Sequence, residues 1–185
     1  MADGEPPHAV GYTIRDGLRA EADDPEQMLA AVDWLVDRAA EAPTAEERVR
    51  LLGRAGGYAA IVRDLDRAEV LLSDAIISAN RHGLARQAAA SRIRLADVNA
   101  LRGDAATAVQ QLTELLHEVR NEPSLDDLLD FVHQHLGKAH LEAGNTAKAV
   151  HHLSRALAHR EQRGDADLLA STRAALARAR REEIT

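Results

Sequence analysis

Histidines are the side chains of this sequence that are best suited to metal or proton chemistry. Six of them fall between residues 133 and 159: His133, His135, His140, His151, His152 and His159. His133 and His140 lie seven residues apart, which places them on one face of a helix, and His159 follows His152 by the same spacing. Two metal ligands on one helix normally lie four residues apart, and no pair of histidines in the sequence has that spacing. We therefore predict no metal site, and we retain a metal- or pH-responsive protein as the last alternative.

Patterns typical of catalysis are not found elsewhere in the sequence. There is no cysteine, and no Ser-His-acid order stands out. Gly53, Gly56 and Gly57 lack the Lys-Ser/Thr that follows a phosphate-binding loop, and they fall within an expected helix. The sequence therefore predicts a protein that is not an enzyme and that uses no cofactor.

Composition narrows the class of partner. The net charge is −7 and aromatic residues make up only 2% of the chain, whereas nucleic-acid binding needs a basic face and often stacking rings. No apolar run approaches the roughly 18 residues of a membrane span, and residues 1–13 lack the basic-then-apolar pattern of a signal peptide. We expect a cytoplasmic protein that binds neither nucleic acid nor a membrane, and the absence of cysteine fits that compartment.

Helical spacing of apolar residues runs along most of the chain, and the apolar content is largely Ala, Leu and Val. Asp24-Pro25 and Thr44 with Glu47 are typical of helix starts. These patterns predict helices at the following places: 25–42, 45–62, 65–80, 84–101, 105–120, two within 131–160, and 166–182. We also expect a disordered segment over residues 1–8 and a weak helix over Ala9–Glu21.

Small residues recur at a fixed spacing in these expected helices. The first helix of each pair carries Gly56, Ala96 and Gly137, which are separated by 40 and 41 residues. The second helix of each pair carries alanines with the same separations: Ala68, Ala108 and Ala149. A repeat of about this length predicts stacked helical hairpins.

The stretch 131–160 resembles a tetratricopeptide repeat (TPR). Its first helix contains Leu136-Gly137, the turn is Gly144-Asn145, and the second helix has small and apolar residues in the family's order: Ala149, Leu153 and Ala156. The likeness covers about residues 44–162, and degenerate flanks continue the register to about 183. His133 and His140 replace the family's bulky aromatics, and the spacing of about 40 exceeds the common spacing of about 34. The longer unit is similar to repeats of bacterial regulatory and signalling proteins.

This resemblance implies an all-α fold, a right-handed superhelical α-solenoid of antiparallel helix pairs. We divide the chain accordingly into six parts. They are a disordered segment (1–8), a degenerate helical half-repeat (9–43), three TPR-like repeats (44–83, 84–123 and 124–164) and a C-terminal capping helix (165–185).

In proteins with such repeats the first helices line a concave groove that usually holds a peptide or a partner helix. The resemblance places eight residues of this sequence in such a groove: Arg54, Arg94, Asp97, Phe131, Gln134, His135, Lys138 and Glu142. Arg54, Arg94 and His135 are at equivalent positions and can form a basic column that binds a carboxylate. Ordinary solvated surface is the alternative interpretation of these cations.

We therefore expect a non-catalytic protein–protein interaction module that binds a peptide or helical segment of a partner protein. A homo-oligomeric scaffold is the alternative hypothesis. Leu168, Leu169 and Leu176 lie in a last helix that no later helix of the sequence covers, so that terminal helices can pair two copies in a homodimer.

Overall fold

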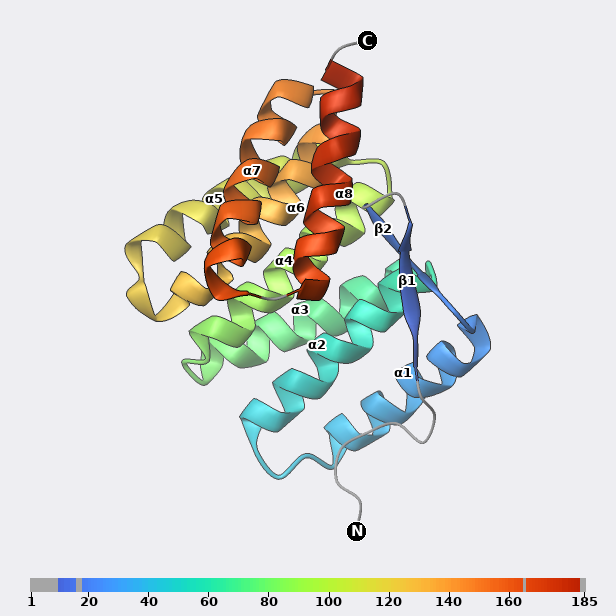
Figure 1. Ribbon diagram of the computed structural model, residues 1–185. Helices are drawn as coiled ribbons and strands as arrows, with labels where there is room; N and C mark the ends of the chain where they lie inside the picture. Colours follow the sequence, from blue (N-terminus) through green and yellow to red (C-terminus); the bar gives the residue numbers. More distant parts are fainter. Residues whose placement is uncertain (1–9, 16–17, 165, 184–185) are drawn as a thin grey trace. The chain divides into compact units, whose positions relative to one another are not determined.

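A computed structural model describes residues 10–15, 18–164 and 166–183. Within these residues the chain forms eight α-helices, one 3-10 helix and one two-stranded sheet (Figure 1). In chain order the elements are β1 (Tyr12–Arg15), β2 (Arg19–Ala22), α1 (Pro25–Ala40), α2 (Ala45–Ile61), α3 (Leu65–Arg81), α4 (Ala85–Leu101), α5 (Ala105–Asn121), η1 (Pro123–Leu128), α6 (Leu129–Glu142), α7 (Thr146–Arg163) and α8 (Ala166–Glu183). The predicted succession of antiparallel helices is confirmed.

The N-terminal part of the described chain differs from the prediction. The weak helix expected over Ala9–Glu21, and with it the helical start of the 9–43 half-repeat, is wrong, because β1 and β2 form a two-stranded sheet there. The aromatic and β-branched residues of β1 favour a strand over a helix, and the helical spacing of apolar residues was too weak to outweigh them. The disordered segment predicted over 1–8 lies outside the described residues.

Polar side chains start the helices where the sequence predicts them. Asp24 Oδ1 accepts hydrogen bonds from the backbone N–H groups of Glu26 and Gln27, both at 3.0 Å. Thr44 Oγ1 accepts one from the Glu47 N–H at 3.1 Å. These contacts satisfy N–H groups that the first turn of a helix leaves without a carbonyl partner. A glycine ends one of the helices: Gly164, after the last residue of α7, adopts φ +76°, a left-handed conformation that glycine reaches without strain.

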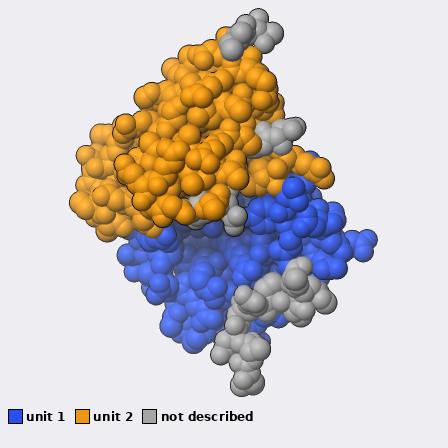
Figure 2. Space-filling view, viewed as in Figure 1, with its two compact units in different colours: residues 1–13, 20–98 blue, residues 14–19, 99–185 orange. Residues whose placement is uncertain are grey.

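The chain divides into two compact units, coloured separately in Figure 2. Unit 1 comprises residues 1–13 and 20–98, and unit 2 comprises residues 14–19 and 99–185. In unit 1, α2 packs against both α1 and α3. In unit 2, α6 packs against α5 and α7, and α7 packs against α8. The boundary between the units falls within α4 and within each of the two strands, so each unit contains a part of the sheet.

The recurring glycines lie at close helix contacts in each unit. A Cβ placed on Gly56 of α2 would lie 2.6 Å from Leu72 Cγ of α3. A Cβ on Gly137 of α6 would lie 2.5 Å from Leu153 Cγ of α7. Both leucines are fully buried. The same Gly-on-Leu contact therefore occurs in both units, which gives the repeat spacing a structural basis.

Candidate functional site

In unit 1 the expected binding residues lie where α4 faces α2. Arg94 is exposed and lies along the two glycines of α2 that face it. A Cβ built on Gly57 would lie 3.4 Å from Arg94 Cδ, and one on Gly53 would lie 3.8 Å from an Arg94 terminal nitrogen. Arg94 donates a 3.4 Å hydrogen bond to the Ala90 carbonyl. The absence of side chains at the two glycines thus leaves room for the guanidinium on this face.

The two arginines of the predicted basic column in unit 1, Arg54 and Arg94, both have polar neighbours. Arg54 donates through Nε to the Tyr58 hydroxyl at 2.9 Å, and its guanidinium lies 5.3 Å from the centre of the Tyr58 ring. Asp97, one turn after Arg94 on α4, is close enough to act on the Arg94 charge, and so is Tyr12 of β1. Arg54 and Arg94 therefore each have neighbours that restrict the position of the guanidinium.

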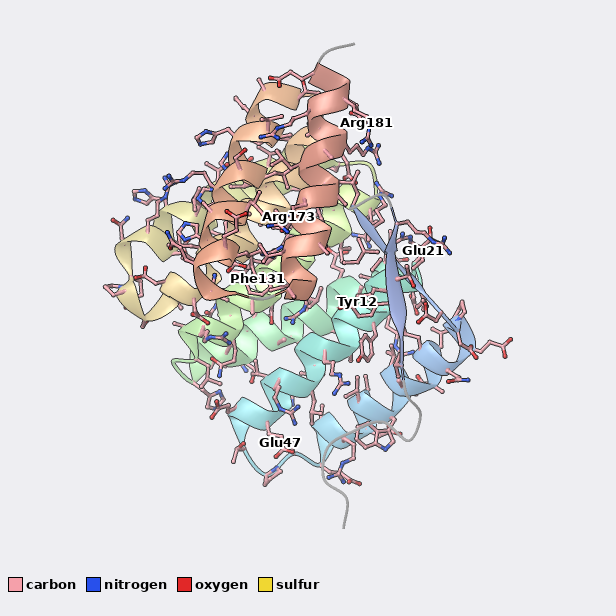
Figure 3. The ribbon with its side chains drawn as sticks, in the orientation of Figure 1. Tyr12, Glu21, Glu47, Phe131, Arg173 and Arg181 are labelled. Atoms are coloured by element: carbon pink, nitrogen blue, oxygen red, sulfur yellow. The ribbon has the colours of Figure 1, made fainter. Side chains whose placement is uncertain are left out.

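In unit 2 the expected binding residues follow one face of α6. Phe131, labelled in Figure 3, is half-buried, as are His135, Lys138 and Glu142. Gln134 is different, because it is only 2% exposed and neither its Oε1 nor its Nε2 has a hydrogen-bond partner. A buried amide without partners costs free energy, so this side chain is the most unusual polar group on the face.

Glu142 already has a partner that the sequence did not indicate. Its Oε1 accepts hydrogen bonds from Nε and a terminal nitrogen of Arg19, at 3.1 and 2.9 Å. Its Oε2 is buried and has no hydrogen-bond partner. The two residues are 123 positions apart, so no local pattern could have paired them.

The histidines form a cluster between α6 and α7. The Nδ1 atoms of His133 and His152 lie 2.9 Å apart, and the rings of His159 and His140 stack on His133 and His152, at centroid distances of 6.1 and 5.4 Å. Burial lowers the pKa of His133 to about 3 and that of His152 to about 4, and neighbouring histidines add to both shifts. Burial also lowers the pKa values of His140 and His159. The cluster is therefore neutral at physiological pH, and neutral rings pack between the two helices.

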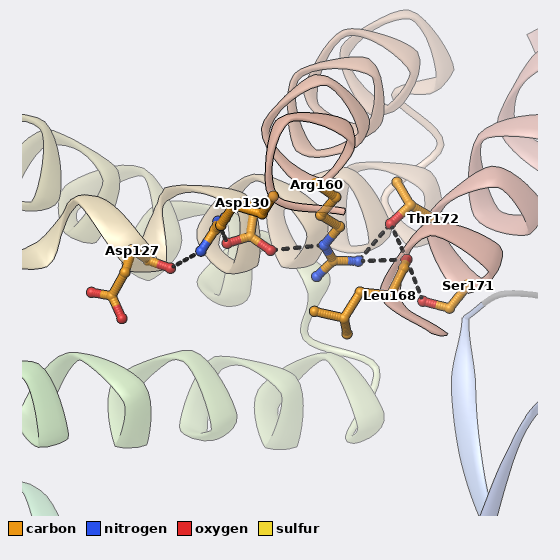
Figure 4. Close-up of polar contacts among 7 residues, drawn as sticks. Asp127, Asp130, Arg160, Leu168, Ser171 and Thr172 are labelled. Atoms are coloured by element: carbon orange, nitrogen blue, oxygen red, sulfur yellow. Dashed lines mark hydrogen bonds and ion pairs between the residues drawn. The ribbon is translucent and has the colours of Figure 1, made fainter. Parts of the chain in front are cut away.

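A buried ionic network joins α6, α7 and α8 (Figure 4). Arg160 donates to Asp130 Oδ2 at 2.8 Å, to the Leu168 carbonyl at 3.2 Å and to the Thr172 hydroxyl at 2.5 Å. Arg163 also pairs with Asp130. The Arg160 guanidinium lies 5.3 Å from the centre of the Phe131 ring, which fixes that ring on α6.

Sequence reasoning missed this network, although a signal was present. Arg160 continues the buried stripe of α7 that contains Ala149, Leu153 and Ala156. A basic residue at such a position needs a buried acid. Asp130 is that acid, and it therefore pairs with Arg160 in the interior of unit 2.

Among the described residues, no group of three or more His, Cys, Asp or Glu side chains is arranged to hold a metal ion. Within those residues, no helix has both the length and the apolar character needed to cross a membrane. A pocket of about 430 Å³ in unit 1 lies between the α1–α2 loop and the end of α3, and its lining includes Arg48, Asp74 and Ile77.

Comparison with known proteins places the fold. No family model matches the sequence, and no curated protein matches it. Two crystal structures of a Podosopora anserina protein, described as a kinesin light chain with nearly identical TPR-like repeats, are similar to this chain. The first is a point variant and has a TM-score of 0.60, and the second has a TM-score of 0.59. Both are 18% identical in sequence to this chain. Each match covers 85% of this chain, and it covers 79% of the first structure's chain and 80% of the second's. The fold is therefore TPR-like, and the resemblance inferred from residues 131–160 is confirmed at the level of the fold.

Proposed function

We propose that this chain is a non-catalytic protein–protein interaction module that binds a peptide or helical segment of a partner on the first-helix faces of its repeats. The observation that carries the proposal is the α6 face, where the half-buried Phe131 and Lys138 lie beside Gln134. The Gln134 amide has no hydrogen-bond partner and is only 2% exposed, so a bound segment meets it once this side chain turns outward. A glutamine amide offers one acceptor oxygen and two N–H donors. A peptide group of a bound segment offers the complementary acceptor and donor. The TPR-like fold supports this assignment because such repeats present extended surfaces for protein partners.

The neighbours of Gln134 suit a segment of mixed character. Phe131 contributes a half-buried ring, and Lys138 contributes a cation one turn further along α6. In unit 1, Arg94 on its glycine-lined face suits a carboxylate of the partner, because a guanidinium can bind both oxygens at once. These residues are proposed contacts of the same partner class.

Replacement of Gln134 by methionine tests the proposal. Methionine has a similar length and no polar group, so the variant should keep or gain stability because a buried amide without partners is removed. Partner recovery by cross-linking and capture under native conditions should fall at least tenfold. Gln110→Ala, an exposed glutamine on α5, is the control and should capture partners like wild type. Equal recovery by Gln134→Met and wild type would contradict the role of the amide, and capture of the chain alone would contradict the module.

A homo-oligomeric scaffold is the second candidate. Leu168 and Leu169 of α8 are half-buried and can contribute to pairing of two copies. Leu176, by contrast, is only 4% exposed, so it is not available for that contact. A single mass of one chain by light scattering at high concentration would exclude the scaffold. The proposed setting of either function is the cytoplasm of a bacterium, on the basis of the Ala- and Arg-rich, cysteine-free composition.

A further inference from the structure

Residues 18 and 19 lie on unit 2 in the manner of a bound peptide. Leu18 is only 7% exposed and belongs to a buried cluster with residues of α6, α7 and α8: Leu141, Ala149, Leu153, Ala175, Leu176 and Ala179. It enters this cluster from the strand pair, not from a helix, and it precedes β2 directly. An apolar side chain from a separate segment thus packs among apolar residues of three helices.

The next residue supplies the polar half of the contact. Arg19 places Nε and a terminal nitrogen on Glu142 Oε1, at 3.1 and 2.9 Å. Its side chain is 42% exposed, whereas that of Glu142 is 19% exposed. The ion pair is therefore more exposed than the cluster that contains Leu18, and both contacts involve the C-terminal end of α6.

We propose that this end of α6, together with α7 and α8, is a recognition site for a short segment in which an apolar residue is followed directly by arginine. In this chain the site is occupied in cis by Leu18 and Arg19. The inference rests on the proposed function as an interaction module and names the chemistry of one partner segment. A partner with the same two residues competes with the chain's own segment.

Three observations indicate that the cis occupant is replaceable. Glu142 Oε2 is buried without a partner, so Arg19 uses only half of the carboxylate, and a bidentate arginine would satisfy both oxygens. The strands of the hairpin have four residues each, and an isolated pair of strands this short has little stability of its own. The net charge of −7 favours the approach of a basic segment.

The occupancy can be tested with the full-length chain and a fluorescein-labelled peptide that has the sequence of residues 12–22. Wild type keeps its site filled by a tethered copy at high effective concentration, so it should bind the peptide weakly. The variant Leu18→Ala/Arg19→Ala empties the site and should bind the peptide at least tenfold more tightly in fluorescence anisotropy. Equal affinity for both proteins, or no binding to either, would overturn the proposal.

Two controls make the result specific. Arg38→Ala removes an exposed arginine that pairs with Glu41 on α1, and it should bind the peptide as weakly as wild type. Adding Glu142→Gln to the emptied variant should weaken peptide binding about tenfold, and no change would contradict the assigned arginine site. If the emptied variant fails to fold in circular dichroism, Arg19→Glu and the swapped pair Arg19→Glu/Glu142→Arg replace it. The single variant should then bind the peptide more tightly than wild type, and the swap should restore wild-type behaviour.

The outcomes separate this inference from the broader function. If Gln134→Met loses its partner while the emptied variant and wild type capture equal amounts, the module stands and the cis competitor is refuted. If the peptide binds as expected while no partner is captured, the site stands and the module is refuted. A wild-type dimer that disappears in the emptied variant would show that the segment is exchanged between two copies, and it would overturn occupancy in cis.

Discussion

The imidazole rings of His133 and His152 face each other through their Nδ1 atoms. With Nδ1 atoms 2.9 Å apart, one of His133 and His152 must donate an N–H and the other must accept with a lone pair. The pair cannot hold a proton on both Nδ1 atoms, and the cations around it make an added charge still less favourable. From α5 comes Arg120, and from α7 come Arg155 near His133 and Lys148 near His152. The cluster therefore consists of polar rings whose packing between the helices depends on their neutrality.

This neutrality predicts a loss of stability in mild acid. The folded-state pKa values of about 3 and 4 lie below the value of about 6.5 expected for unfolded histidine, so the unfolded chain binds protons first. The stabilisation is complete above about pH 6.5 and is lost as the pH falls towards 4 and 3. Between pH 7.5 and pH 5 each of the two histidines should lower the free energy of unfolding by about 2 kcal/mol, which is about 4 kcal/mol for the pair, measured by urea denaturation.

Carboxylates titrate in the same pH range and also change the free energy of unfolding. The difference between wild type and the variant His133→Gln/His152→Gln isolates the contribution of the two histidines. That variant should show a pH dependence smaller by the same amount. A wild-type slope equal to that of the variant would contradict the prediction.

At the scale of elements, the close approach of paired helices explains why glycine recurs in the first helix of a pair. Gly56 and Gly137 contact the buried Leu72 and Leu153 in the same way, although they lie in different units. A glycine inside a helix costs about 0.5–1 kcal/mol relative to alanine. The contact with leucine outweighs that cost, because a larger residue would push the two helices apart.

Alanine substitutions should therefore have opposite signs at two glycines of the same helix. At Gly56 the added Cβ would lie 2.6 Å from Leu72, and Gly56→Ala should cost about 1–3 kcal/mol through overpacking. At Gly57 the nearest contact is 3.4 Å, to the flexible Arg94 side chain, and Gly57→Ala should gain about 0.5–1 kcal/mol. Thermal unfolding of the two variants checks this, and a stabilised Gly56→Ala would refute the packing argument.

The accuracy of the sequence analysis depended on the range of the interactions. Asp24 and Thr44 were found because a cap and its N–H partner lie two or three residues apart. Gly137 was found because its contact recurs at the repeat period. The pairing of Arg19 with Glu142 has no period and no local pattern, so only the three-dimensional structure reveals it. The candidate binding face on α6 was placed by register, whereas the burial of Gln134 depends on packing that a register does not contain.

On the scale of the whole molecule, a helix at the end of a repeat stack needs a cover for its apolar face. In unit 2 a residue from near the beginning of the chain provides such a cover, since Leu18 buries part of the apolar surface of α6, α7 and α8. The last helix thus has a cover that the order of the repeats does not predict.

Removal of that cover should promote self-association. Leu18→Asp puts a charge in the cluster and exposes Leu176, so the variant should form dimers or larger species as its concentration rises in light scattering. Ile14→Asp is the matched control, because Ile14 is in the same hairpin and is already 38% exposed. The control should behave like wild type. A Leu18→Asp variant with wild-type mass at all concentrations would contradict the covering role.

The network around Arg160 has a consequence for the order in which the chain is synthesised. Asp130 is made first, its partner Arg160 follows 30 residues later, and the acceptors Leu168 and Thr172 come after both. Until α8 has left the ribosome, Arg160 lacks two of its hydrogen-bond acceptors. Burial of its guanidinium would then leave N–H groups without partners. Unit 2 therefore reaches its final packing only when its last helix has been translated, so that a nascent chain halted at residue 165 should remain more open to protease than the finished one.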